Sequence, residues 1–212
     1  MLSGPIHTDI DGATAVTSTS TLISERVTAD GRPWVLRHAR PADAEPLARL
    51  YAAVRAEGRW LVTSATAVSP PSEAFFIAEL IRTDESAVVV AEAGGEIVGN
   101  ALVMSDRDVS SRHVGVLSVT VADGWRDVGL GTALVAATQD WVRERGLTRL
   151  ALSVFPDNAR AIAVYTRAGF VREGIRRRQF RQADGTYRDE LLMAWFPESG
   201  AADRWRAGEG TP

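Results

Sequence analysis

The chain has 212 residues, 45% of them hydrophobic and 24% charged, with a formal net charge of −3. These values are ordinary for a globular protein and favour one domain with a sizeable core. The charge balance indicates no nucleic-acid or anionic membrane partner, and no apolar run approaches the ~20 residues that a bilayer span needs. All 24 basic residues are arginine, and there is no lysine or cysteine. This composition excludes lysine and cysteine nucleophiles, disulfides and thiolate metal sites. With three scattered histidines, we expect no metal.

The two ends of the chain read differently from its middle. Residues 1–31 are rich in Thr, Ser, Ala, Asp and Gly with little periodicity, which predicts a disordered N-terminal tail. They lack the basic start and apolar core of a signal peptide, so we expect a cytoplasmic protein. We expect one domain over residues 32–197 and a flexible C-terminal tail over 198–212. Two-fold dimers are the commonest assembly, and a homodimer is the expected state.

Periodicity predicts the elements of the first half of the domain. An apolar alternation predicts a strand over 34–39, and helical spacing predicts a helix that starts at Pro41. A loop over 58–71 contains Trp60, Leu61 and Val62. A second helix is expected over 72–82, strands over 87–92 and 96–104 joined by a Gly94–Gly95 hairpin turn, and a strand over 113–121.

A glycine-bearing turn follows that last strand. The strand breaks at Asp123–Gly124, and the turn Arg126-Asp-Val-Gly129-Leu-Gly131 leads into a helix from about Thr132 to Gly146. Such a turn lets backbone N–H groups approach an anion, and the helix dipole favours negative charge there. Arg126 adds a fork of donors suited to phosphate. Alone, the pattern fits an ordinary glycine turn equally well.

The remaining elements complete the domain. We expect a strand over 150–155, parallel to the strand 113–121, because a crossover helix joins them. Asn158 opens a helix that Gly169 ends. A long strand over 170–181 carries the basic stretch Arg176–Arg178, and after a turn at 183–185 the last strand covers 187–196.

This element order and two motifs resemble those of the GNAT superfamily of N-acetyltransferases over residues 34–196. The first motif, Arg126-x-x-Gly129-x-Gly131, matches the arginine/glutamine-x-x-glycine-x-glycine signature of that family. The second lies about thirty residues on and runs from Asn158 through Tyr165 to Gly169-Phe170. The C-terminal Asp-Gly-x-Tyr187-x-Asp189 segment and His113-Val-Gly also look like those of small-molecule and amino-acid acetyltransferases.

The resemblance implies an α/β (α+β) GNAT fold. Its central, mixed and mostly antiparallel sheet has seven strands, is splayed between the fourth and fifth, and is flanked by four helices. It implies acetyl-CoA as acyl donor and a small primary amine, such as an amino acid or a toxic analogue, as acceptor. Two alternatives stay open: a protein N-terminal or side-chain acetyltransferase, and a non-catalytic acyl-CoA sensor. A P-loop protein is disfavoured because that loop needs a lysine.

The resemblance also assigns residues to acetyl-CoA. The glycine turn would hold the pyrophosphate, and the strand before it would pair with the pantetheine amides as an added strand does. The expected acetyl-CoA-binding residues are Val119, Thr120, Val121, Arg126, Asp127, Val128, Gly129, Leu130, Gly131, Thr132, Asn158 and Tyr165.

Tyr165 is the expected general acid, because a phenol is protonated at neutral pH and can donate to the thiolate that leaves. Its spacing from Ile162 also fits plain core packing. Asn158 could bind the pantetheine arm, cap its helix, or do both.

The sequence offers several candidates for the general base. Many relatives carry a glutamate on the central strand where this chain has Val116. We expect His113 as the catalytic base, with Glu73, Asp189 or Glu190, or deprotonation through water, as alternatives. On the acceptor side we expect Trp60 and Glu73, although Trp60 also fits a core cover and Glu73 a first helical turn. Arg176–Arg178 would attract a carboxylate or the 3′-phosphate of CoA, or form a solvated strand face.

Overall fold

The computed structural model describes residues 22–60, 70–105, 108–182 and 184–197. In this part of the chain one sheet has eight strands in the order β1-β2-β3-β4-β5-β6-β8-β7. Each pair of neighbours is antiparallel except β5 and β6, which are parallel. The strands are β1 (Leu22–Val27), β2 (Pro33–His38), β3 (Ser86–Ala93), β4 (Glu96–Ser105), β5 (Val114–Val121), β6 (Arg149–Val154), β7 (Val171–Arg181) and β8 (Tyr187–Trp195).

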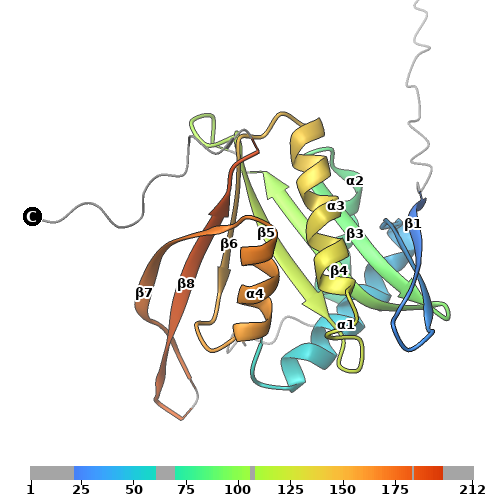
Figure 1. The fold of residues 1–212 in the computed structure, drawn as a ribbon, viewed down its shortest axis with the longest axis horizontal. Helices are drawn as coiled ribbons and strands as arrows, with labels where there is room; N and C mark the ends of the chain where they lie inside the picture. The colour runs from blue at the N-terminus through green and yellow to red at the C-terminus, as the bar shows by residue number, and fades with distance from the viewer. Residues whose placement is uncertain (1–21, 61–69, 106–107, 183, 198–212) are drawn as a thin grey trace, which may run out of the picture.

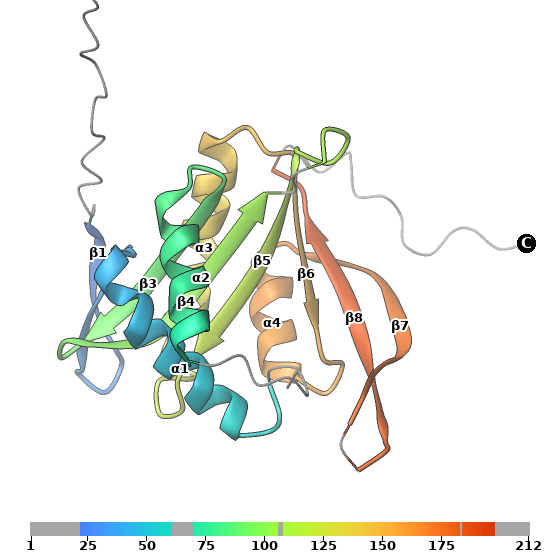
Figure 2. The ribbon, with the colours of Figure 1, turned by 180° about the vertical axis from the view of Figure 1, so that it is seen from behind.

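Two pairs of helices cover the two faces of this sheet. Helices α3 (Leu130–Glu144) and α4 (Ala159–Arg167) lie on one face (Figure 1), and α1 (Ala44–Ala56) and α2 (Pro70–Arg82) lie on the other (Figure 2). Strand β3 is buried on both sides: Val89 packs toward α3, whereas Val88 and Val90 pack toward α1 and α2. Successive strand side chains point to opposite faces, so this apolar run serves two cores at once.

Strand β1 corrects the expected count of seven strands and the expected extent of the N-terminal tail. It pairs antiparallel with β2 through a turn in which Gly31 has a φ of 86°. Its side chains gave little signal because Ile23 is 40% and Val27 67% exposed. Backbone pairing, more than a hydrophobic pattern, therefore holds this edge strand.

The expected splay lies between β5 and β6. Their pairing covers only Val114↔Arg149, Gly115↔Leu150 and Val116↔Ala151, although β5 continues to Val121 and β6 to Val154. At the paired end a Cβ on Gly115 would lie 3.3 Å from Leu150 Cδ1 on β6. The strands are thus close at one end and apart at the other, which opens the sheet where the glycine turn begins.

The other expected helices and strands of the described chain are confirmed to within a few residues, with a short 3₁₀ turn at Pro41–Asp43 before α1. The Gly94–Gly95 turn has φ values of 58° and 84°, as a tight hairpin turn requires. Leu61 and Val62, residue 183, and the tails 1–21 and 198–212 lie outside the described residues.

Candidate active site

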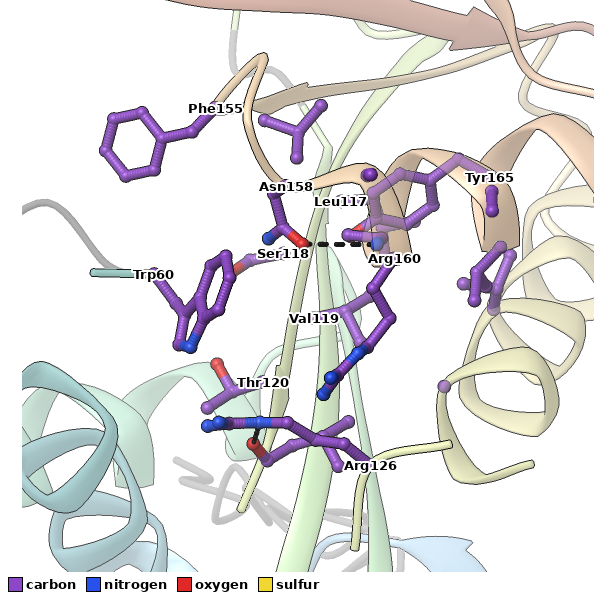
Figure 3. A pocket seen from close by; sticks show the side chains of 18 of the residues that line it. Trp60, Leu117, Ser118, Val119, Thr120, Arg126, Phe155, Asn158, Arg160 and Tyr165 are labelled. Atoms are coloured by element: carbon purple, nitrogen blue, oxygen red, sulfur yellow. Dashed lines mark hydrogen bonds between the residues drawn. The ribbon is translucent and has the colours of Figure 1, made fainter. Parts of the chain in front are cut away.

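A cleft of about 970 Å³ lies at the splayed ends of β5 and β6. Its walls come from β5, the glycine turn and α3, α4, the end of β6, and residues at the ends of α1, β7 and β8. Figure 3 shows Trp60 and Phe155 on one side of it and Tyr165 on the other, with Asn158 between them. The volume is of the size that small-molecule and cofactor sites have.

The backbone of β5 is exposed to this cleft. Ala122 N–H donates to Val98 O on β4 at 2.9 Å. Backbone groups of alternate strand residues point to opposite sides, so those of Val119 and Val121 point away from β4, toward the gap. In that gap β5 has no ladder partner on β6 beyond Val116 among the described residues. The expected pantetheine partners therefore form a strand edge without a β-ladder partner, where Val121 O accepts from Arg126 Nε.

The glycine turn places uncapped N–H groups at the same cleft. Gly129 is the N-cap of α3 with a φ of 94° and provides no side-chain cap, and the first helical bond runs from Ala133 N–H to Gly129 O. The N–H groups of Leu130, Gly131 and Thr132 precede that bond. A helix N-terminus with such free donors attracts anions. The side chains of Val128 and Leu130 pack against the core, so they could serve a ligand through the backbone only.

The Arg126 side chain is differently placed from what the phosphate expectation implies. Its Nη1 and Nη2 donate to the two Glu57 oxygens at 2.8 and 2.5 Å, and its Nε donates to Val121 O at 3.1 Å. Its donors are thus engaged with the residue after α1 and with the end of β5. In this arrangement Arg126 ties the glycine turn to the sheet and to α1.

Helix α4 brings the second motif into the cleft. Asn158 is its N-cap and accepts from Ala161 N–H at 3.2 Å (Figure 3), and Asn158 also lines the cleft. The ring of Tyr165 is 8% exposed and packs against Phe170, and burial raises the pKa of Tyr165 to about 12. Tyr165 lines the cleft as well as the core, so the two expectations for it do not exclude each other.

The side of the cleft opposite α3 and α4 is aromatic and holds one carboxylate. The side chains of alternate β5 residues face it, and Thr120 Oγ1 is buried there without a hydrogen-bond partner among the described residues. This wall consists of Val54, Trp60, Val116, Ser118, Thr120, Ser153, Phe155, Phe180 and Glu190. Trp60 therefore lines the cleft, and Val116 leaves the wall apolar where the family resemblance led us to look for a glutamate.

The candidate general bases differ in where they lie relative to the cleft. His113 is exposed before β5, at the end away from the splay, and Glu73 is ion-paired with Arg55 in the first turn of α2. Asp189 accepts from the Arg178 N–H at 2.7 Å. None of these three lines the cleft, so the expected roles of His113 as base and Glu73 as substrate ligand have no geometric support. Of the candidates, Glu190 alone lines it.

Several cleft residues had no assigned role from the sequence. Phe155 and Phe180 meet edge to face at 5.8 Å, and Arg160 contacts Asp127 at 3.1 Å beside the glycine turn. Arg160 stands two residues after Asn158, so the second motif offered a signal for it. Phe180 offered none, because its place depends on how β7 pairs with β8.

The described residues contain no group of three or more His, Asp or Glu side chains placed to hold a metal ion. No helix in the same part of the chain is long and apolar enough to cross a membrane.

A splayed sheet edge beside an uncapped helix N-terminus can bind a ligand that carries both amide and phosphate groups. The acetyltransferase (GNAT) family model matches residues 51–170. The chain therefore belongs to the GNAT acetyltransferase family and is an acyltransferase.

Individual relatives support the same family. The chain is 27% identical over 164 residues to the L-amino acid N-acetyltransferase AaaT of Escherichia coli (strain K12), covering 76% of this chain and 96% of that protein. It is 29% identical to the streptothricin acetyltransferase of Streptomyces lavendulae, covering 70% and 87%. A phosphinothricin acetyltransferase structure from Sinorhizobium meliloti in complex with acetyl-CoA has a TM-score of 0.70 at 20% identity, covering 79% and 91%.

Proposed function

We propose that this protein transfers the acetyl group of acetyl-CoA to the primary amine of a small molecule, such as an amino acid or a toxic analogue. One observation carries the proposal: the free edge of β5 and the uncapped N-terminus of α3 open into the same cleft. Pyrophosphate on the N–H groups of Gly131 and Thr132 would let the pantetheine amides extend along Val119 and Val121.

The thioester would then lie between the two sides of the cleft. The Val119 N–H polarises its carbonyl, the amine lone pair attacks the carbonyl carbon, and the carbon–sulfur bond breaks as the amide forms. With the pKa of Tyr165 near 12, full proton transfer to a thiolate of reference pKa ~8.5 is uphill by about 5 kcal/mol. The Tyr165 hydroxyl therefore donates a hydrogen bond to the leaving sulfur, and it loses its proton only as it takes one from the reacting nitrogen.

Charge along the cleft supports an anionic donor on the α4 side. Arg160 and Arg167 line it from one face of α4, at spacing i and i+7. Either guanidinium can pair with a phosphate group of CoA. The relatives with amino-acid and antibiotic acceptors support a small acceptor, whereas homodimer formation and a cytoplasmic location stay predictions.

The test is release of free CoA from acetyl-CoA with a panel of amino acids, other small amines and peptides. We expect turnover with at least one small amine and much slower turnover with peptides. Turnover with peptides alone would favour a protein acetyltransferase. Tight acetyl-CoA binding with no turnover across the panel would favour a sensor, and no binding of acetyl-CoA would contradict both.

A further inference from the structure

Glu190 is a carboxylate held inside the cleft. It lies on β8 and is 6% exposed, and it lines the cleft between β6 and β7. Its neighbours Leu191 and Met193 alternate with it, and both pack in the core under α3 and α4. Leu191 therefore points to that core, and Glu190 points to the opposite face, where Trp60 lies.

One cation pairs with this carboxylate and leaves its other side open to the cleft. Arg176, opposite on β7, donates from Nη1 to Glu190 Oε2 at 3.0 Å. The Arg176 side chain is 56% exposed, whereas that of Glu190 is 9% exposed. The pair is thus lopsided, with the guanidinium outside and the carboxylate inside. An ionised carboxylate has about four lone-pair sites, so this one can accept from a second donor.

Aromatic rings complete the surroundings of Glu190. Trp60, Phe155 and Phe180 line the same cleft. The Phe155 ring is fixed from two directions, by the edge of Phe180 and by Arg188, whose guanidinium carbon lies 3.5 Å from the ring centroid. A carboxylate in the same cleft as aromatic rings can recognise an alkylammonium group that has an apolar body, through an ion pair and apolar contact.

The charges that line the cleft are sorted by side. The cations Arg126, Arg160 and Arg167 lie at the glycine turn and on α4, where Arg126 is paired with Glu57 and Arg160 with Asp127. Among the described lining residues, Glu190 is the other carboxylate, and it lies on the aromatic side. This sorting fits an anionic donor on one side and a cationic acceptor on the other.

We propose that Glu190 binds the protonated amine of the acetyl acceptor, which releases one proton to solvent before its lone pair attacks the thioester, and that Trp60, Phe155 and Phe180 receive the apolar part of the same molecule. The acceptor class is then a small primary amine with an apolar or aromatic body. This inference rests on the proposed function, because it names the acceptor subsite of the same cleft. The carboxylate of Glu190 can bind an amine, whereas the apolar side chain of Val116 in the same cleft cannot.

The test compares two probes of nearly equal shape by calorimetric titration into the full-length protein saturated with CoA. One probe is 2-phenylethylamine, which is cationic at neutral pH, and the other is 2-phenylethanol, which is neutral. We expect the wild-type protein to prefer the amine by about tenfold or more. Glu190→Gln should remove this preference, and Glu190→Asp should keep part of it.

The matched control is Asp189→Asn, which makes the same charge change one residue earlier on β8, outside the cleft. It should leave the preference intact, and the affinity for CoA in all variants reports whether the fold is kept. Equal binding of the two probes by the wild type, or a preference that survives in Glu190→Gln, would overturn the inference. Because no turnover is needed, a protein that prefers the amine but acetylates nothing would contradict the proposed function alone.

Discussion

Substitution of Tyr165 tests the proposed chemistry of the cleft directly. Replacing it with phenylalanine keeps the ring that packs against Phe170 and removes the hydroxyl that would contact the leaving sulfur. We expect Tyr165→Phe to lower kcat about 10- to 100-fold, with little change in the KM for acetyl-CoA. Tyr187→Phe, at an exposed position of β8 outside the cleft, is the control and should behave as wild type.

The raised pKa of Tyr165 predicts how the protonation of its hydroxyl depends on pH. Burial disfavours the phenolate, so the pKa rises from 10.0 to about 12. The hydroxyl therefore stays protonated through pH 10, and its stabilising effect on the fold would be lost only as the pH rises from about 10 toward 12. Absorbance at 295 nm, wild type minus Tyr165→Phe, should show no phenolate at pH 10. A phenolate signal at pH 10 would contradict the raised pKa of Tyr165.

At the scale of elements, the tie between the glycine turn and α1 makes a prediction that separates two roles of Arg126. If Arg126 holds the turn in place through Glu57, Glu57→Gln and Arg126→Met should each weaken acetyl-CoA binding, by about 3- to 10-fold. The double variant should be no worse than the worse single one, because both remove the same contact. Calorimetry with acetyl-CoA measures all three. Tighter binding by Glu57→Gln would instead show that Glu57 competes with phosphate for Arg126.

The closed end of β5 and β6 makes a prediction about stability. A methyl group on Gly115 would lie 2.9 Å from Val103 Cγ1 and 3.3 Å from Leu150 Cδ1, and both neighbours are fully buried. We expect Gly115→Ala to lower the free energy of unfolding by about 1–3 kcal/mol, since overpacking displaces buried side chains. Gly174→Ala, where a methyl group meets nothing within 4 Å, is the control for urea unfolding. Equal stability of the two variants would contradict the close fit.

The elements also show what a sequence can predict. The helices and the glycine turn follow from local patterns such as the Gly129–Gly131 spacing and the apolar run of β5, whereas the splay was implied by the family resemblance. Strand β1 was missed because its exposed side chains carry no such pattern. The motif predicts phosphate as the partner of Arg126. The sequence does not reveal its partner in the structure, Glu57, because Glu57 is 69 residues away in the chain. Glu190 could not be chosen among four candidates, because its place depends on which strands pair with β8.

At the scale of the whole molecule, a buried ion pair links β2 to the start of α1 and predicts how stability depends on pH. Arg37 donates to both Asp43 oxygens, at 2.6 and 2.9 Å. Burial alone would raise the pKa of Asp43, but hydrogen bonds from the Arg37 side chain and from the Arg40 N–H outweigh it and lower the pKa. A carboxyl group with a lowered pKa stabilises the fold above its unfolded value and loses that effect as the pH falls through its folded value.

Asp43→Asn should therefore cost about 1–3 kcal/mol of unfolding free energy at pH 7, and the cost should shrink as the pH approaches 2. Asp84→Asn, at a side chain that is 98% exposed, is the control and should change little at either pH. Urea unfolding at pH 7 and at pH 3 measures both. A cost that stays constant, or grows, as the pH falls would contradict the ionic origin of the effect.

In the proposed function, the acetyl group passes from a donor on the side of the cleft under α3 and α4 to an acceptor on the side facing Trp60. The most direct test of this proposed transfer is to identify the molecule that receives the acetyl group. The protein would be incubated with acetyl-CoA labelled with ¹³C in the acetyl group and with 2-phenylethylamine or amino acids, and the products analysed by mass spectrometry. We predict the label on the nitrogen of an amine. Labelled acetate with free CoA and no acetylated amine would contradict the account.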